Sequence, residues 1–253
     1  EENRSIISKV LPKVLRFSHH HNNLAVIFQN DEDKSLFLKH QIIKEFQAYK
    51  IKGSGVNLKQ YNYTPEPEEG RIKVLLAARM IVEKGIFILT DAAMKLKGQY
   101  QNKVQFLLCG GLDDNPMAIK ESELKAVCDG NYIKWLGYRS DVLDLLKKCH
   151  IVAFPSYYKE GLPRALIEAT AIGRPIITTN SIGCKETVID GYNGYLIPIK
   201  DSDALSYRLD ILFRNKNLRL KMGLNSRTLA EQYFSIDNVI YTHLHIYETL
   251  LEK

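Results

Sequence analysis

The sequence predicts an α/β fold, a parallel Rossmann-like sheet with helices on both faces. Short apolar runs alternate with helical stretches from about residue 72 to residue 198, as is typical of sheets built from strand–helix units. The runs are apolar almost throughout rather than at every second position, which is expected of strands buried on both faces. With 253 residues, the chain is long enough for one large domain with an appendage.

The first 70 residues are expected to hold a basic helix, a strand and a helix, joined by irregular segments. Residues 1–23 look helical and end in three adjacent histidines, His19 to His21, whose consecutive side chains do not converge on one metal ion. The run 24–30 predicts a buried strand, and a helix capped by Asp31 follows it. Residues 51–61 form a glycine turn, and the segment 64–70, rich in proline and glutamate, forms a linker.

The rest of the chain is predicted to form six strands with helices between them. The strands are expected at residues 72–79, 104–111, 132–137, 150–156, 175–180 and 194–198. Helices are expected at residues 86–98, 140–149, 162–173 and, as an amphipathic C-terminal helix, 237–253. Ligands of open parallel sheets bind beyond the carboxyl ends of the strands, so the strand-to-helix loops should carry the function.

Composition restricts the partners and the compartment. The formal charge of +6 and the pI of about 9.0 favour anionic partners, such as nucleotides, nucleic acid or an acidic membrane surface. Four widely spaced cysteines argue against a zinc ribbon or a redox motif and fit reduced cytosolic thiols. No apolar run approaches the roughly 18 residues of a membrane span, and no signal peptide opens the chain, so we expect a cytoplasmic protein.

Two loops carry residues that suit a phosphate ligand. Arg79 ends a strand and Lys84 follows five positions later, so both cations could converge on a diphosphate, although a solvated loop also explains them. Gly53 and Gly55 allow the backbone to approach a ligand closely. The third glycine of a dinucleotide-binding fingerprint is missing there, and a plain turn is an equal alternative.

A third loop, residues 135–142, follows the strand that runs into Gly137. Its exposed backbone could pair with the edge of a nucleobase. Ser140 or Asp141 could cap the next helix, and capping explains these residues equally well.

The loop after the strand at 150–156 predicts an anion site. A helix is expected to begin at Pro163, which suits the first helical position. The backbone N–H groups of Gly161 and Leu162 would then point outward, unpaired, at the positive end of the helix dipole. Glu160 precedes them, and stabilisation of its carboxylate by the dipole is the structural explanation for its presence.

Glu168 is harder to explain by structure alone. Its helix is apolar almost all round and therefore expected to be buried, and an unpaired carboxylate is unfavourable in such a place. A ligand diol would offer it two hydroxyl donors, which is the favoured interpretation. A structural ion pair with Arg164, one turn earlier, is the alternative.

The loops together resemble the retaining family 4 glycosyltransferases of the GT-B fold, also described as glycosyl transferases group 1. The resemblance rests on "ARMIVEKG", "LCGG", "WLGYRSDV", "EGLPRALIEATAIGRPIITTN" and "IGCKETVIDGYNGYLIP", in this order between about residues 51 and 200. It concerns the donor-binding C-terminal domain, and similar sequences are common among bacterial capsule and lipopolysaccharide enzymes. The segment "AVIFQNDEDKSLF" looks like the last strand and helix of the family's first domain.

The resemblance implies a role for each candidate residue. Arg79 and Lys84 would neutralise the donor's diphosphate, and Glu160 would contact the transferred sugar, so these three are the expected catalytic residues. Glu168 would bind the ribose hydroxyls. The other donor-binding positions are Gly161 and Leu162 at sugar and phosphate, Gly55 beside the phosphates, and Gly137 and Tyr138 at the base. The family generally needs no metal, and no cofactor other than the donor substrate is implied.

The implied reaction transfers a hexose or hexosamine, with retention, from a nucleotide-diphosphate sugar, expected to be UDP-linked. The acceptor would be a glycan or a lipid-linked glycan in surface polysaccharide synthesis. A peripheral position at the inner face of the cell membrane agrees with the net charge and with such acceptors. Nucleic acid is not an expected partner.

The resemblance also implies a division of the chain, because GT-B enzymes bind their substrates between two comparable domains. Residues 1–52 would be a remnant of the acceptor-side domain, residues 53–236 the donor-binding domain, and residues 237–253 a crossing helix. Such a chain is expected to bind the donor but to transfer sugar slowly or not at all.

Three other functions fit parts of the sequence. A sugar-nucleotide 2-epimerase shares the fold and uses different catalytic residues. A basic nucleic-acid-binding module would need clustered cations with interleaved aromatic residues, whereas the cations here are scattered. A noncatalytic nucleotide sensor would bind the donor without transferring sugar.

Overall fold

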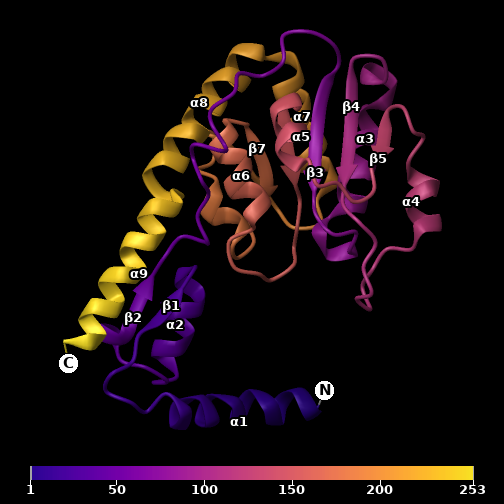
Figure 1. Ribbon diagram of the computed structural model, residues 1–253. Helices are drawn as coiled ribbons and strands as arrows, with labels where there is room; N and C mark the ends of the chain where they lie inside the picture. The colour runs from indigo at the N-terminus through magenta and orange to yellow at the C-terminus, as the bar shows by residue number, and fades with distance from the viewer. Residues whose placement is uncertain (1, 253) are drawn as a thin grey trace.

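The computed structural model describes residues 2–252, and it describes side chains from residue 10 onward. Figure 1 shows a large layered α/β unit, a smaller unit that contains the N-terminal helix, and a long helical stretch along one side that reaches both. No helix within the described range has the length and apolar character that crossing a bilayer requires.

The large unit is built on one parallel sheet of six strands. Its strands are β3 (Ile72–Ala77), β4 (Val104–Cys109), β5 (Ile133–Trp135), β6 (Ile151–Phe154), β7 (Ile176–Thr179) and β8 (Gly194–Ile197). They lie in the order β5-β4-β3-β6-β7-β8, so the six predicted strands and the predicted fold class are confirmed. The chain builds outward from β3 in one direction and from β6 in the other. Such a switch point is where open α/β sheets bind their ligands.

Helices cover both faces of this sheet because successive residues of each strand point to opposite sides. Val74 and Leu76 pack toward α3 (Ile86–Tyr100) and α7 (Ser202–Arg214), whereas Leu75 packs toward α5 (Val142–Lys148) and α6 (Arg164–Ile172). A short helix, α4 (Glu121–Val127), precedes β5 at the sheet edge. The side chains of Val74, Leu75 and Leu76 are all fully buried, which explains why the strands lack an alternating pattern of apolar and polar residues.

The small unit contains a second parallel sheet of two strands, β1 (Val26–Phe28) and β2 (Ala48–Lys50). On one face it packs against α2 (Asp31–Lys39) and the end of α1 (Glu2–Ser18), and on the other against α9 (Ile236–Leu251). The expected strand at 24–30 is therefore present but only partly buried, because the sheet has two strands and α9 covers one face incompletely. β2 was not predicted.

The C-terminal third is more helical than the sequence pattern indicated. The predicted C-terminal helix is present as α9, whereas α7 and α8 (Lys216–Tyr233) were not predicted. α8 packs along α6, and Figure 1 shows α8 and α9 running in succession down one side of the molecule. α9 thereby leaves the large unit and contacts the small one. The division at residues 52 and 236 stays a prediction.

Two predicted helix starts are off by one residue. Asn30, not Asp31, is the N-cap of α2: its side-chain oxygen accepts a hydrogen bond from the backbone of Asp33 at 2.8 Å. Asp31 is the first helical residue, and its carboxylate binds Lys50 Nζ at 2.5 Å instead. Pro163 is extended and stands just before α6, which begins at Arg164.

The segment 64–70 is irregular, as a linker should be, but it is held firmly. Glu66 is buried and forms a bidentate ion pair with Arg219 of α8, with N–O distances of 2.8 and 2.9 Å. Arg174, also buried, donates hydrogen bonds to the backbone oxygens of Thr64 and Leu146, both at 2.8 Å. The linker expected from composition is therefore present as an irregular segment, and its contacts with Arg174 and Arg219 hold it in place. The composition of the segment does not show that Arg174 and Arg219, which lie much later in the chain, will bind it.

Candidate functional site

A cavity of about 260 Å³ lies at the carboxyl ends of β3, β4 and β5, beside the start of α6. Its wall includes Arg79 after β3, Tyr138 and Arg139 after β5, and Arg164 and Glu168 on α6. These are the strand-to-helix loops in which the sequence placed the function. The fold brings Arg79, Tyr138 and Glu168 to one cavity, although 89 residues separate the first from the last in the sequence.

Two arginines of this wall are paired with nearby carboxylates. Arg79 Nη1 lies 2.9 Å from Asp113, and more than half of the Arg79 side chain is exposed. Arg139 donates two hydrogen bonds to Asp141, and this contact lowers the pKa of Asp141. Asp141 does stand at the start of α5, but its side chain binds Arg139 rather than the helix backbone.

Glu168 is 8% exposed and has two partners in the protein. Its Oε1 accepts hydrogen bonds from Arg164 Nε at 2.8 Å and from the Tyr61 hydroxyl at 3.1 Å. Burial and the neighbouring carboxylate of Glu168 raise the pKa of Tyr61, so this hydroxyl stays a donor. The predicted structural partner, Arg164, is thus present. Both contacts use the same carboxylate oxygen, and neither uses Oε2.

Lys84 and Glu160 come together although 76 residues separate them. Lys84 Nζ lies 2.6 Å from Glu160 Oε1, and the lysine side chain is 7% exposed. The ammonium group also lies 4.8 Å from the centre of the Tyr158 ring. Lys84 ends a 3₁₀ helix (Val82–Lys84), and the chain then turns at Gly85 with φ of +80°. A side chain at Gly85 would collide with the Pro155 carbonyl, so the close approach of the two loops requires glycine.

The backbone of the loop before α6 has an unexpected partner. The N–H group of Leu162 donates a hydrogen bond of 2.9 Å to the side-chain oxygen of Gln29, which directly follows β1. Gly161 lies against the same side chain. Sequence reasoning missed Gln29. The available signal was its position at the carboxyl end of a strand, where the other functional residues were sought.

None of the three candidate glycines, Gly55, Gly137 and Gly161, lines the cavity wall. Gly55 is buried against the start of α9, where an added Cβ atom would come within 2.8 Å of Ile236 Cα. That contact gives Gly55 a structural reason of its own. Gly137 has a φ of +66°, and its carbonyl accepts a hydrogen bond from Gly110 N–H at 2.9 Å, next to the exposed Tyr138.

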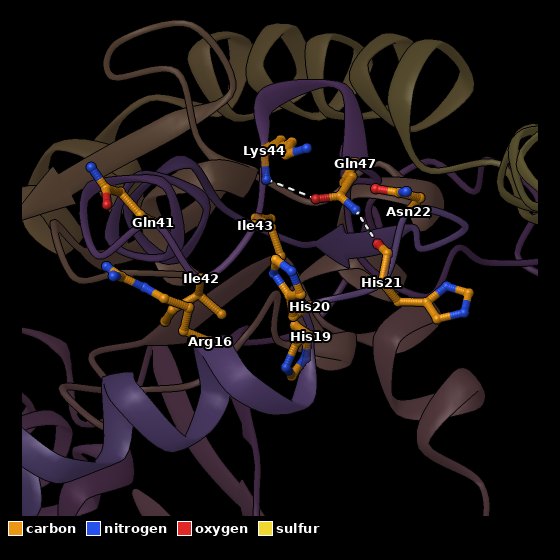
Figure 2. A pocket seen from close by; sticks show the side chains of 10 residues that line it. All are labelled: Arg16, His19, His20, His21, Asn22, Gln41, Ile42, Ile43, Lys44 and Gln47. Carbon is orange, nitrogen blue, oxygen red and sulfur yellow. Dashed lines mark hydrogen bonds between the residues drawn. The ribbon is translucent and has the colours of Figure 1, made fainter.

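The three adjacent histidines line a separate cavity of about 290 Å³ between the end of α1 and the loop before β2. Figure 2 shows the ring of His21 pointing away from those of His19 and His20. His19 is occupied locally: its Nδ1 is 2.8 Å from the Leu15 carbonyl oxygen. Among the side chains that the structure describes, from residue 10 to residue 252, no group of three or more His, Cys, Asp or Glu is arranged to hold a metal ion.

Comparison with known proteins identifies the family. The model of the family described as "Glycosyl transferases group 1" matches residues 63–229, which include β3 to β8 and the loops that follow β3, β5 and β6. The chain belongs to this family. The resemblance noted from the loop motifs is therefore confirmed.

Two curated relatives show which glycosyltransferases this chain is similar to. An N,N'-diacetylbacillosaminyl-diphospho-undecaprenol alpha-1,3-N-acetylgalactosaminyltransferase from Campylobacter jejuni is 30% identical over 99% of this chain and 65% of the relative. The capsular polysaccharide biosynthesis glycosyltransferase CapM from Staphylococcus aureus is 26% identical over 85% of this chain and 60% of its own length. The chain thus spans less than two thirds of these relatives.

Solved structures share the fold. A glycosyltransferase from Rickettsia africae superposes with a TM-score of 0.83 at 22% identity, covering 95% of this chain and 68% of the other. Anabaena Alr3699/HepE in complex with UDP-glucose gives a TM-score of 0.78 at 21% identity, covering 99% and 70%. The neighbours are GT-B glycosyltransferases, so the architecture of the present chain is part of that fold.

Proposed function

We propose that this chain is the donor-binding part of a retaining glycosyltransferase that takes a hexose or hexosamine from a nucleotide-diphosphate sugar. The cavity at the carboxyl ends of β3 to β5 is the single observation that supports this best. Its wall combines three arginines with one buried glutamate, and so offers cations to a diphosphate and an acceptor to hydroxyl groups. A nucleotide sugar carries both kinds of group.

The two predicted cations suit the departing diphosphate. Glycosyl transfer leaves negative charge on the nucleoside diphosphate, and fixed cations stabilise that charge in the transition state. Lys84 is buried, held by Glu160 and stacked near Tyr158, so it loses little freedom when a phosphate approaches. Arg79 is more exposed and would leave Asp113 for the phosphate. Together they supply the charge that a divalent cation supplies in other transferases, so we propose that no metal is required.

Glu168 suits the ribose of the donor. Arg164 and Tyr61 fix one of its oxygens, and Glu168 borders the cavity with the other oxygen uncommitted. A ribose diol can donate to that oxygen. The Arg164 contact would then orient the carboxylate instead of replacing the ligand, so the two interpretations of Glu168 are compatible.

Glu160 and Tyr138 would contact the two ends of the donor. The ion pair with Lys84 supports a role for Glu160 beside the proposed diphosphate, where its carboxylate would accept from sugar hydroxyls or offset positive charge on the sugar ring. Tyr138 is 81% exposed at the cavity mouth, and its ring offers a flat apolar surface to the base. Gly55, with its structural contact to α9, has the weakest support among the candidates.

The proposed acceptor is a glycan or a lipid-linked glycan of a surface polysaccharide. The Campylobacter jejuni relative is named for a diphospho-undecaprenol acceptor, and the Staphylococcus aureus relative for capsular polysaccharide. We propose UDP as the nucleotide of the donor, since the similar Alr3699/HepE fold was solved with UDP-glucose. A lipid-linked acceptor would bring the protein to the cytoplasmic face of the membrane peripherally.

The test is a calorimetric binding panel of uridine, guanosine and adenosine diphosphates and their sugars on the chain and two variants. One nucleotide should bind clearly better than the others. Glu168→Gln should weaken its binding at least about tenfold, the effect of losing one charge-assisted hydrogen bond. Glu248→Gln, an exposed glutamate on α9 without a side-chain partner among the described residues, should change nothing.

Two results would contradict the proposal. One is the absence of binding by every nucleotide of the panel. The other is a Glu168→Gln variant that is folded and binds as tightly as the unaltered chain. Product analysis with the whole protein separates transfer from 2-epimerisation, because transfer yields a new glycoside and the epimerase yields free UDP with an altered hexosamine.

A further inference from the structure

The side chain of Gln29 accepts a hydrogen bond from the backbone of Leu162, one of the two loop amides that were expected to bind the donor. Its Oε1 lies 2.9 Å from Leu162 N and is directed at the space beside Gly161, where any side chain would collide with it. Gln29 comes from the small unit, 133 residues earlier in the chain. The small unit therefore reaches into the proposed donor site with one polar side chain.

The backbone before Gln29 pairs with β2, and the backbone after it is held by several contacts. Asn30 caps α2, and Glu32 forms an ion pair with Lys185 in the loop after β7. Lys50, on the neighbouring strand β2, lies between Asp31 and Glu186. These contacts fix the end of β1 against the loops of the large unit and keep Gln29 within reach of Leu162.

The contact is also of a kind that a phosphate can replace. A neutral amide oxygen is a weaker acceptor than a phosphate oxygen, since hydrogen bonds to charged groups are roughly twice as strong. Gln29 is only half-buried, so its amide group can return to solvent when it loses this contact. A ligand that places an anionic oxygen at Leu162 N–H must first displace Gln29 Oε1.

We infer that Gln29 is a placeholder that holds the Leu162 amide in the ligand-free protein and yields it to the donor's diphosphate. The inference rests on the proposed function. Gln29 then sets the donor affinity, because the apparent dissociation constant includes the work of opening this contact. It also links the small unit to the occupancy of the donor site, since the bound phosphate releases one of the contacts between the two.

The test uses the whole chain, inorganic pyrophosphate and UDP as probes, and three variants. Gln29→Ala removes the competing oxygen, and Gln29→Glu keeps an acceptor in place and adds negative charge. Gln60→Ala, at an exposed glutamine in the turn at residues 58–60, is the matched control. Gln29→Asn, whose shorter side chain withdraws the oxygen from Leu162, replaces Gln29→Ala if that variant does not fold.

Calorimetry should show that Gln29→Ala binds both probes about threefold to tenfold more tightly, because a neutral hydrogen bond no longer has to be broken. Gln29→Glu should bind them more weakly, and Gln60→Ala should match the unaltered chain. In heteronuclear NMR spectra of the unaltered chain, each probe should shift the Leu162 amide and the Gln29 side-chain amide together. A contact with a merely structural role would not give that paired response.

A failure of this inference can be told apart from a failure of the proposed function. If UDP binds in a Glu168-dependent manner while the Gln29 amide signals stay in place, the inference fails and the proposed function stands. The inference also fails, and the proposed function stands, if Gln29→Ala binds the probes no more tightly than the unaltered chain does. If neither probe binds, the inference fails, and the proposed function fails with it only when no nucleotide of the wider panel binds.

Discussion

Lys84 and Glu160 form an ion pair that joins the loop after β3 to the loop after β6, across the switch point of the sheet. The lysine is 7% exposed and the glutamate 23%, so the pair is partly shielded from solvent. A buried ammonium group is stabilised only while a partner stays close. The pair therefore keeps a cation ready at the position proposed for the diphosphate.

Replacing this cation should weaken donor binding and, to a smaller extent, the fold. Lys84→Met keeps the length of the side chain and removes its charge. Loss of a charge-assisted hydrogen bond of about 1.5–3 kcal/mol should raise the dissociation constant for UDP at least about tenfold in calorimetry. Lys134→Met, at an exposed lysine of β5, is the control. Unchanged UDP binding by a folded Lys84→Met variant would remove Lys84 from the site.

Tyr138 should affect nucleoside binding but not phosphate binding. Because its side chain is 81% exposed, Tyr138→Ala should leave the unfolding free energy unchanged. Loss of an aromatic contact of about 0.5–1.5 kcal/mol should weaken UDP binding about twofold to tenfold while pyrophosphate binding stays the same. Tyr241→Ala, at a tyrosine 74% exposed on α9, controls for loss of an exposed ring. Equal weakening for both ligands would place the effect of Tyr138 at the phosphates.

The segment 64–70 should contribute to stability through Glu66. Its ion pair with Arg219 is almost closed to solvent, with side-chain exposures of 4% and 5%. Removing one partner of such a pair leaves a buried charge, so Glu66→Gln should lower the unfolding free energy by about 3–5 kcal/mol in urea denaturation. Glu69→Gln, at an exposed glutamate of the same segment, should change it by less than about 0.5 kcal/mol. A similar small effect of both substitutions would show that the segment is a loose linker after all.

His150 should make the fold sensitive to mild acid. It is 4% exposed, and burial lowers its pKa from 6.5 to about 4, with the nearby Glu66 carboxylate opposing only part of this. The folded chain thus binds the proton less readily than the unfolded chain. The contribution of His150 is complete above pH 6.5 and is lost as the pH falls from 6.5 to 4, by up to about 3 kcal/mol.

The variant His150→Asn isolates this contribution. Its side-chain oxygen can accept the Lys73 N–H that His150 Nδ1 accepts at 3.1 Å, and it does not titrate. The difference in unfolding free energy between the unaltered chain and the variant should therefore shrink as the pH falls through this window. A difference that is independent of pH would show that His150 titrates normally in the folded chain.

The fold was largely predictable because burial on both faces leaves a direct mark on the sequence. The strands around Leu75 and Val152 are continuous apolar runs, and loops that follow such runs in a parallel sheet meet at one end. The loop position indicated Arg79 and Lys84, whereas Glu168 was indicated by its place in an apolar and therefore buried helix. α7 was not predicted although its buried residues Leu205, Leu209 and Leu212 recur at helical spacing, whereas the buried face of α8 includes polar or small residues such as Arg219, Gly223 and Ser226.

The contacts between the site residues were harder to predict from the sequence than the residues themselves. Glu160 and Lys84 were both predicted at the site, but nothing in the spacing indicates that they bind each other. The contact of Arg164 with Glu168 was the structural alternative weighed for Glu168, because the two residues lie one helical turn apart. Gln29 was missed because its partner is a backbone group 133 residues away, and such a contact requires no particular residue type at Leu162.

The central claim is that the free oxygen of Glu168 accepts from the ribose of a nucleotide donor, and calorimetry with UDP and 2′,3′-dideoxy-UDP tests it most directly. The unaltered chain should prefer UDP by at least about tenfold, and Glu168→Gln should lose most of that preference while binding dideoxy-UDP almost as the unaltered chain does. Equal affinity of the unaltered chain for both nucleotides, or a preference that survives in Glu168→Gln, would contradict the account.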